Sequence, residues 1–213
     1  MNETDKSHAY SFDFDDTIIQ RNKLVRKTDV LRDYIRGRRS GWEFQEAPIS
    51  DWDTEFPDSF KSRLAVFGMN RFQSDVFPGV EEFLENAARN GIKIYGNTGR
   101  PHIAGVVRAS ERTLEKGQIR DYFEKIYYAP YRSRSAESKA GVLSHLDKQH
   151  DSVTHFDDDM HALRFLATEF PHMDFVHVDF RLGSHAHLAP NRLVPSNIQR
   201  VGHVNEYLRK EKV

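Results

Sequence analysis

A short apolar run near the N-terminus ends in a group of carboxylates. Residues 10–12 are typical of the end of a strand, and Asp13, Asp15 and Asp16 follow them at once, before Thr17. Carboxylates crowded at a strand end repel one another, and a divalent cation is the simplest way to offset that repulsion. The spacing also brings Asp13 and Asp15 to the same side of an extended chain. These residue types therefore indicate cation-assisted chemistry rather than packing.

Three later stretches supply the residue types that such chemistry would need. Two are strand-like runs that end in polar residues, and one is a helix-like segment with a lysine in its first turns. Any one of these patterns is weak by itself, and their value lies in their order along the chain. The residues concerned are Thr98, Arg100, Lys139, Asp157 and Asp158.

This succession of Asp-x-Asp-x-Thr, Thr, Lys and Asp-Asp resembles the four motifs of the haloacid dehalogenase-like hydrolase superfamily, over about residues 9–180. The resemblance implies that Asp13 is a nucleophile and that Asp15 is a general acid and base. It also implies a Mg²⁺ site and a phosphoryl-binding site. The Mg²⁺ ligands would be Asp13, the backbone carbonyl of Asp15, Asp157 and Asp158, and the phosphoryl group would meet Thr98 and Lys139. Arg100 is a further candidate to contact the phosphoryl group because it closely follows Thr98 in the sequence, which the resemblance itself does not imply.

The activity implied by the resemblance is a Mg²⁺-dependent phosphatase that forms an aspartyl-phosphate. Hydrolysis of a phosphate monoester needs a positioned nucleophile, neutralisation of phosphoryl charge and a proton for the leaving oxygen. An aspartate nucleophile divides one difficult step into two easier ones. A second carboxylate that moves the proton contributes about 10²–10⁴-fold in rate. The expected partner is a phosphorylated small molecule, whose identity the sequence leaves open.

Several alternative functions are open to different degrees. A phosphoacceptor receiver domain uses the same residue types, but its acidic pair comes first in the chain, whereas here Asp157 and Asp158 close the series. A dehalogenase lacks the second acid that Asp15 supplies. A non-enzymatic adaptor is disfavoured because unused clustered carboxylates cost stability. A phosphomutase or phosphotransferase on the same fold stays open, as does a phosphatase acting on nucleic-acid ends.

The elements that must position these residues alternate between strand and helix patterns. Such alternation predicts an α/β fold, with a Rossmann-like, mostly parallel sheet between helices. We expect strands near residues 9–14, 92–97, 125–129, 152–156 and 174–179. We expect helices over residues 80–90, 102–116, 135–147, 159–168 and 196–210, the last begun by a capping box of Ser196 and Gln199.

Residues 20–76 interrupt this alternation. We predict that they form a small, mainly helical cap inserted after the first strand, and that residues 1–19 and 77–213 form the catalytic core. Within the cap, residues 21–39 are rich in Lys and Arg, whereas residues 44–58 contain acids and no base. The basic stretch would steer anionic substrates, or it would be a solvated helix face. This basic stretch is also the only basis for the alternative of a phosphatase that acts on nucleic-acid ends.

Composition sets broad limits on the class of protein. With 38% hydrophobic and 30% charged residues, the 213-residue chain has the make-up of a soluble protein with a packed core. Its net charge of −1 gives no general attraction to nucleic acid, and no apolar stretch approaches the ~20 residues that span a bilayer. The chain has no cysteine, and its N-terminus is polar, so neither disulfides nor a signal peptide are expected. We expect a cytoplasmic protein of undetermined oligomeric state.

Overall fold

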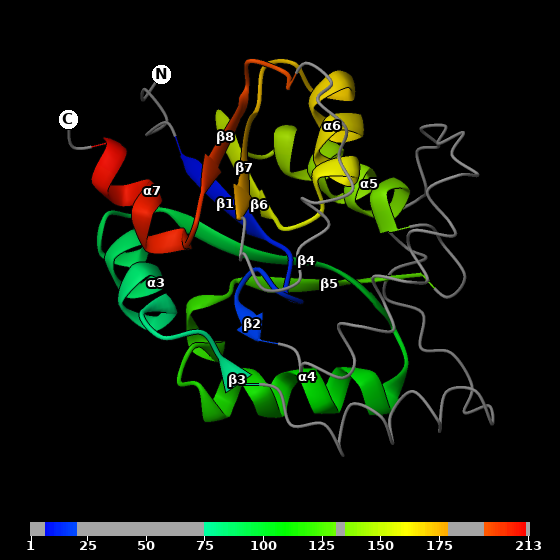
Figure 1. Ribbon diagram of the computed structural model, residues 1–213. Coiled ribbons are helices and arrows are strands. Elements are labelled where there is room, and N and C mark those ends of the chain that lie inside the picture. The colour runs from blue at the N-terminus through cyan, green and yellow to red at the C-terminus, as the bar shows by residue number, and fades with distance from the viewer. Residues whose placement is uncertain (1–6, 21–74, 131–134, 179–193, 212–213) are drawn as a thin grey trace, which may run out of the picture.

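The computed structural model describes residues 7–20, 75–130, 135–178 and 194–211, the last four of these by their backbone alone. Six parallel strands form the main sheet, in the order β5-β4-β1-β6-β7-β8. Their bounds are β1 His8–Phe12, β4 Lys93–Pro101, β5 Lys125–Ala129, β6 Ser152–Asp157, β7 Asp174–Val178 and β8 Ile198–Val201. The predicted parallel α/β fold is therefore confirmed, and Figure 1 shows the helices on both sides of this sheet.

Two helical layers cover the sheet (Figure 1). The helices are α3 Val80–Arg89, α4 Ala104–Lys116, α5 Ser135–Asp147, α6 Met160–Glu169 and α7 Val204–Glu211, with a short 3₁₀ turn at Arg120–Tyr122. One apolar core includes Phe12, Phe83 and Tyr207, and so joins β1 to α3 and α7. A second includes Leu143 and Leu163, and so joins the other face to α5 and α6. Within the described parts of the chain, no helix is both long and apolar enough to cross a bilayer.

The predicted elements agree closely with those observed before residue 179. Helix α5 has the predicted bounds. Asp159 caps α6, because its carboxylate accepts hydrogen bonds from the backbone N–H groups of His161 and Ala162. Gly91 has a φ of 75° and ends α3 in the left-handed conformation that glycine adopts freely.

The last predicted helix was wrong in its first part. Residues 198–201 form strand β8, parallel to β7, and the helix begins only at Val204. Ile198 and Val201 are buried, whereas Gln199 and Arg200 are more accessible. Four residues carry too little periodicity to separate a strand from a helix, and the open edge of β7 decides the outcome. The predicted capping box of Ser196 and Gln199 is lost with it.

The central strand β1 is the point at which the chain changes direction across the sheet. After β1 the chain builds β4 and β5 on one side, and it then crosses to build β6, β7 and β8 on the other. In open parallel sheets, ligands bind beyond the carboxyl ends of the strands at such a switch point. Because Asp13 follows β1 directly, the topology places it there.

A tight turn and a two-stranded ribbon follow β1. The backbone N–H groups of Thr17, Ile18 and Ile19 all donate to the carbonyl of Phe14. Strand β2, Ile19–Gln20, then pairs antiparallel with β3, Asp75–Val76. The two ends of the predicted insertion thus lie side by side. The cap itself and its basic stretch fall in residues 21–74, outside the described residues, so the division of the chain into cap and core stays a prediction.

Candidate active site

Asp13 lies at the centre of the carboxyl edge of the sheet. Its backbone N–H donates to the carbonyl of Phe156 on β6 at 2.9 Å, which extends the pairing of β1 with β6 by one step. Strand alternation sends Phe12 into the apolar core and Asp13 to the opposite face, toward α5. There Asp13 is buried, with 5% of the residue exposed.

Lys139 joins Asp13 to Asp157. Its ammonium nitrogen Nζ lies 3.1 Å from Asp13 Oδ1 and donates to Asp157 Oδ2 at 2.6 Å. All three side chains are buried, so these are contacts between charges in a low-dielectric interior. The lysine that the sequence places early in a helix therefore reaches both acidic strand ends, 126 and 18 residues away in the chain.

The two carboxylates that share Lys139 differ in proton affinity. Burial raises the pKa of Asp13 to about 7, and the charges of Asp157 and Asp15 add to this effect, whereas Lys139 opposes it. Burial also acts to raise the pKa of Asp157, but there Lys139 and His155 outweigh it and hold that pKa below its usual range. Asp157 is thus the permanently ionised member. Burial would lower the pKa of Lys139, but Asp13 and Asp157 raise it, so the ammonium stays charged.

The acids also have the arrangement of a cation site. One carboxylate oxygen from each of Asp13, Asp157 and Asp158 lies within 4.8 Å of the others, and all three side chains are buried. Hard cations such as Mg²⁺ prefer oxygen ligands and are usually held by one or two carboxylates, with waters and substrate phosphate completing the shell. Burial raises the pKa of Asp13, and the charges of Asp157 and Asp15 add to this effect, so a cation bound here would favour the ionised carboxylate. The donor set therefore fits Mg²⁺.

Asp15 lies next to this cluster but is bound to Arg100. Arg100 donates from Nη2 to Asp15 Oδ1 at 2.6 Å and from Nε to Oδ2 at 3.1 Å, a two-point pair. Its third nitrogen, Nη1, donates to the hydroxyl of Ser110 on α4 at 2.7 Å. The guanidinium is 7% exposed. Arg100 thus holds a carboxylate in this structure, and its contact with a phosphoryl group stays a prediction.

Thr98 is on β4, the strand that pairs with β1 on the side away from β6. It lies two residues beyond Gly96, the partner of Phe12, and is buried. Its hydroxyl oxygen Oγ1 accepts a hydrogen bond from the backbone N–H of Arg100 at 3.2 Å. This position places Thr98 at the same edge of the sheet as Asp13, as the motif order predicts.

Four residues near the predicted site residues were not themselves predicted to belong to the site. Asn97 donates from its side chain to the backbone carbonyl of Lys139 at 3.3 Å and so ties α5 to β4. The Ser110 hydroxyl accepts a hydrogen bond from Arg100. The His155 ring contacts the Asp157 carboxylate through one nitrogen and the Ser11 hydroxyl through the other. His155 is fully buried, and both of its ring nitrogens lie within hydrogen-bonding distance of oxygen atoms. Strand alternation was the available signal for Ser11 and His155, since each lies two residues before a site acid.

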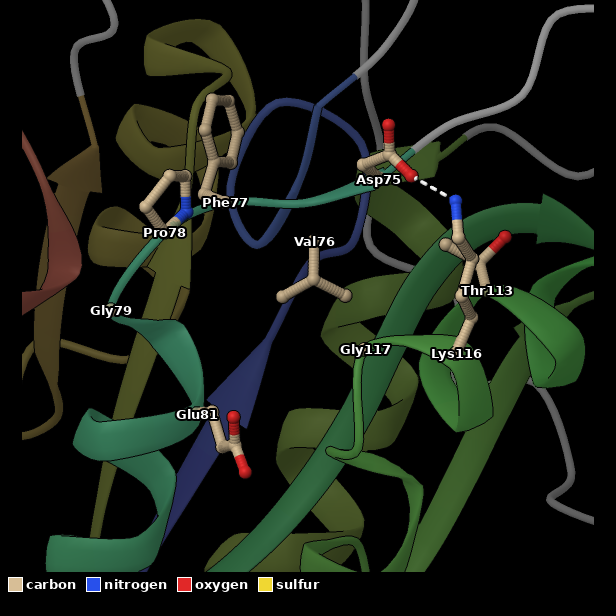
Figure 2. A pocket seen from close by; sticks show the side chains of 9 residues that line it. All are labelled: Asp75, Val76, Phe77, Pro78, Gly79, Glu81, Thr113, Lys116 and Gly117. Carbon is tan, nitrogen blue, oxygen red and sulfur yellow. Dashed lines mark hydrogen bonds and ion pairs between the residues drawn. The ribbon is translucent and has the colours of Figure 1, made fainter.

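A surface groove lies apart from these residues. It is formed where β3 meets the start of α3 and the end of α4, with Val76 and Phe77 among its lining residues and Lys116 paired with Asp75 at its rim (Figure 2). Asp13, Asp15, Asp157 and Asp158 do not line this groove.

The raised pKa of Asp13 predicts a pH-dependent stability in metal-free protein. The ordinary pKa of this group is 3.8 and the folded value is about 7, so between these pH values only the folded chain holds the proton. Stability therefore falls as pH rises through this range. The side-chain amide in Asp13→Asn does not titrate, so in EDTA the melting temperature of this variant minus that of wild type should increase from pH 5 to pH 8.

Other groups that titrate in this range are present in both proteins, so their contributions largely cancel in the difference between the two melting temperatures. Mg²⁺ should reduce the difference at pH 8, because it stabilises the ionised Asp13 of the wild type. A difference that is constant with pH in EDTA would contradict the assignment of this proton to Asp13.

Comparison with known proteins gives a likeness in structure alone. No protein-family model matches the chain, and no curated protein matches its sequence. A haloacid dehalogenase-like family hydrolase from Streptococcus pneumoniae is similar in structure, with a TM-score of 0.54 and 13% identity, over 96% of this chain and 98% of that one. CbbY from Rhodobacter sphaeroides, solved in complex with phosphate, has a TM-score of 0.54 and 15% identity, over 93% and 95%.

A third similar structure is protein tyrosine kinase A, PtkA, from Mycobacterium tuberculosis. It has a TM-score of 0.58 and 16% identity, and the match covers 99% of this chain and 100% of that one. At such identities the likeness concerns the fold. The chain has the fold of the haloacid dehalogenase-like hydrolases.

Proposed function

We propose that this protein is a magnesium-dependent phosphatase that hydrolyses a phosphate monoester through an aspartyl-phosphate on Asp13. The observation that supports this most directly is the contact of Lys139 with both Asp13 and Asp157, with Asp158 beside them. Four separate segments supply these groups and Thr98 to one edge of the sheet. Structural packing alone does not require three buried carboxylates within 4.8 Å of one another.

The first half-reaction would use Asp13 and Asp15. An oxygen of Asp13 attacks phosphorus, the bond from phosphorus to the leaving oxygen breaks, and Asp15 gives that oxygen a proton. Lys139 stabilises the charge that develops on the phosphoryl oxygens, and the Thr98 hydroxyl donates to one of them. Asp13, Asp157, Asp158 and the backbone carbonyl of Asp15 would hold Mg²⁺. When bound, Mg²⁺ would keep Asp13 ionised and offset the charge of the phosphate.

The second half-reaction would release phosphate. Asp15, now ionised, takes a proton from water as the water oxygen attacks phosphorus, and the bond to Asp13 breaks. The two-point pair with Arg100 is the arrangement of an ionised carboxylate and so suits this basic role. For the acidic role, the Asp15 carboxyl group must carry a proton, release Arg100 and donate that proton to the leaving oxygen.

The experiment is a panel of phosphorylated metabolites, together with p-nitrophenyl phosphate, assayed for release of inorganic phosphate. We expect activity with Mg²⁺, its loss in EDTA and its return when Mg²⁺ is added. Borohydride reduces an aspartyl-phosphate to homoserine, so trapping during turnover should give homoserine at position 13 in a peptide mass spectrum. Full activity in metal-free buffer would exclude the metal dependence, and trapping at another acid would exclude the nucleophile.

A phosphotransferase is the second candidate, because PtkA, which shares the fold, is named as a protein tyrosine kinase. On the same site, the phosphoryl group of Asp13 would pass to an acceptor hydroxyl in place of water. Measuring phosphate release against phosphoryl transfer to added acceptors separates the two. Release that matches substrate consumption one to one favours the phosphatase.

A further inference from the structure

His155 lies on the same face of β6 as Asp157, two residues before it, and is fully buried. The register of β6 with β1 sets His155 directly opposite Ser11. Ser11 in turn lies two residues before Asp13. Ser11 and His155 therefore form a cross-strand pair one step before Asp13 and Asp157 on the same face of the sheet. The motif acids alone do not indicate this pair.

The contacts of the imidazole with Asp157 and with the Ser11 hydroxyl favour the tautomer with the proton on Nε2. Nε2 lies 3.3 Å from Asp157 Oδ2, and Nδ1 lies 3.1 Å from both the hydroxyl and the carbonyl oxygen of Ser11. An ionised carboxylate can only accept hydrogen bonds, so a hydrogen bond from His155 to Asp157 requires the proton on Nε2. Nδ1 of the neutral ring is then an acceptor, and the Ser11 hydroxyl is the neighbouring group that can donate to it.

These contacts determine which part of Asp157 is left for a cation. Oδ2 accepts from Lys139 at 2.6 Å and from His155, while Oδ1 accepts from the backbone N–H of Asp159 at 2.9 Å. A carboxylate oxygen has about two acceptor positions. Both positions of Oδ2 are therefore filled, and one position of Oδ1 remains.

We propose that His155, held by Ser11, is a positioning residue for the cation site, which fixes the Asp157 carboxylate so that Oδ1 faces the ion. The inference rests on the proposed function in one respect, the binding of a divalent cation by Asp13, Asp157 and Asp158. Partners that hold ligand side chains in this way typically change metal affinity about 10–100-fold when they are removed.

Ser11→Ala is the sharpest variant, because it keeps the imidazole and removes a single buried hydroxyl. Nδ1 then faces the carbonyl of residue 11, which favours the tautomer with the proton on Nδ1, and Nε2 turns a lone pair toward Asp157. We expect the dissociation constant for Mg²⁺, measured by titration calorimetry, to rise about 10-fold or more. His155→Leu should act in the same direction, and His155→Gln, whose amide N–H can donate to Oδ2, should recover part of the affinity.

The matched control is Thr154→Val. Thr154 is a fully buried neighbour on β6 whose hydroxyl contacts His8. This variant should leave Mg²⁺ affinity within about twofold of wild type. A lower maximal rate in Ser11→Ala with unchanged Mg²⁺ affinity would overturn the proposal, because the proposed role of Ser11 concerns cation binding.

A spectroscopic readout tests the tautomer without any assay of activity. Nitrogen-15 NMR of ring nitrogens distinguishes the two tautomers, and the signal of His155 among the 11 histidines is the one lost in His155→Gln. We expect the proton on Nε2 in wild type and a shift toward Nδ1 in Ser11→Ala. A proton on Nδ1 in wild type, unchanged Mg²⁺ affinity in both Ser11→Ala and His155→Leu, or no Mg²⁺ binding by wild type would each overturn the inference. A protein that binds Mg²⁺ through these acids but releases no phosphate would overturn only the proposed function.

Discussion

Asp13→Asn is expected to lower phosphatase activity by about 10⁴-fold or more, the scale seen when a catalytic nucleophile is removed. The amide is a poor nucleophile, so the aspartyl-phosphate cannot form. The fold should persist, because Asn occupies the same volume and can still accept from Lys139, and the burial that raises the pKa of Asp13 no longer acts on an ionisable group. The measurement is kcat/KM with the best substrate of the panel at saturating Mg²⁺. Intact mass should be recorded alongside, because deamidation of the introduced amide would restore Asp.

Asp159→Asn is the matched control for this variant. Asp159 belongs to the same acidic run as Asp157 but caps α6, and Asn caps helices about as well as Asp. Its activity should stay within a few-fold of wild type. Wild-type activity in Asp13→Asn of verified mass would show that another group attacks phosphorus.

Lys139→Met is expected to destabilise the metal-free protein by about 3–5 kcal/mol, because it removes the ammonium group that the buried carboxylates of Asp13 and Asp157 share. Lys139 is 3% exposed and contacts Asp13 and Asp157. The free energy of unfolding, measured by urea denaturation in EDTA, checks this value. Mg²⁺ should recover part of the loss, because it supplies positive charge to the same acids. Activity should also fall steeply, since the developing phosphoryl charge loses its ammonium.

Lys116→Met is the control that isolates burial. Lys116 pairs with Asp75 at 2.6 Å, the same distance as Lys139 with Asp157, but both side chains are more than half exposed. An exposed pair contributes about 0–1 kcal/mol. Equal losses of unfolding free energy in Lys139→Met and Lys116→Met would contradict the view that burial strengthens the contacts of Lys139 with Asp13 and Asp157. In addition, Lys139→Met with Asp157→Asn should cost less than the sum of the single changes, because the two residues are in contact.

The parallel sheet and the position of the acids could be predicted because they depend on local patterns. Apolar runs of four to six residues that end in polar groups, and that alternate with helices, lead to a parallel sheet with those groups at one edge. Asp13, Thr98 and Asp157 all follow this rule. Strand β8 could not be predicted, because Ile198–Val201 is too short to show a period, and its pairing with β7 decided its conformation.

The contacts among site residues depend on distances that no local pattern contains. Arg100 and Asp15 are 85 residues apart in the chain, and their pairing depends on how far β4 extends beyond β1. Ser11 meets His155 across 144 residues because β1 and β6 adopt one register. By itself, the sequence determined which residues could do chemistry and at which edge of the sheet they lie. Only the tertiary structure decided which charges share a partner, because strand register and helix packing set those distances.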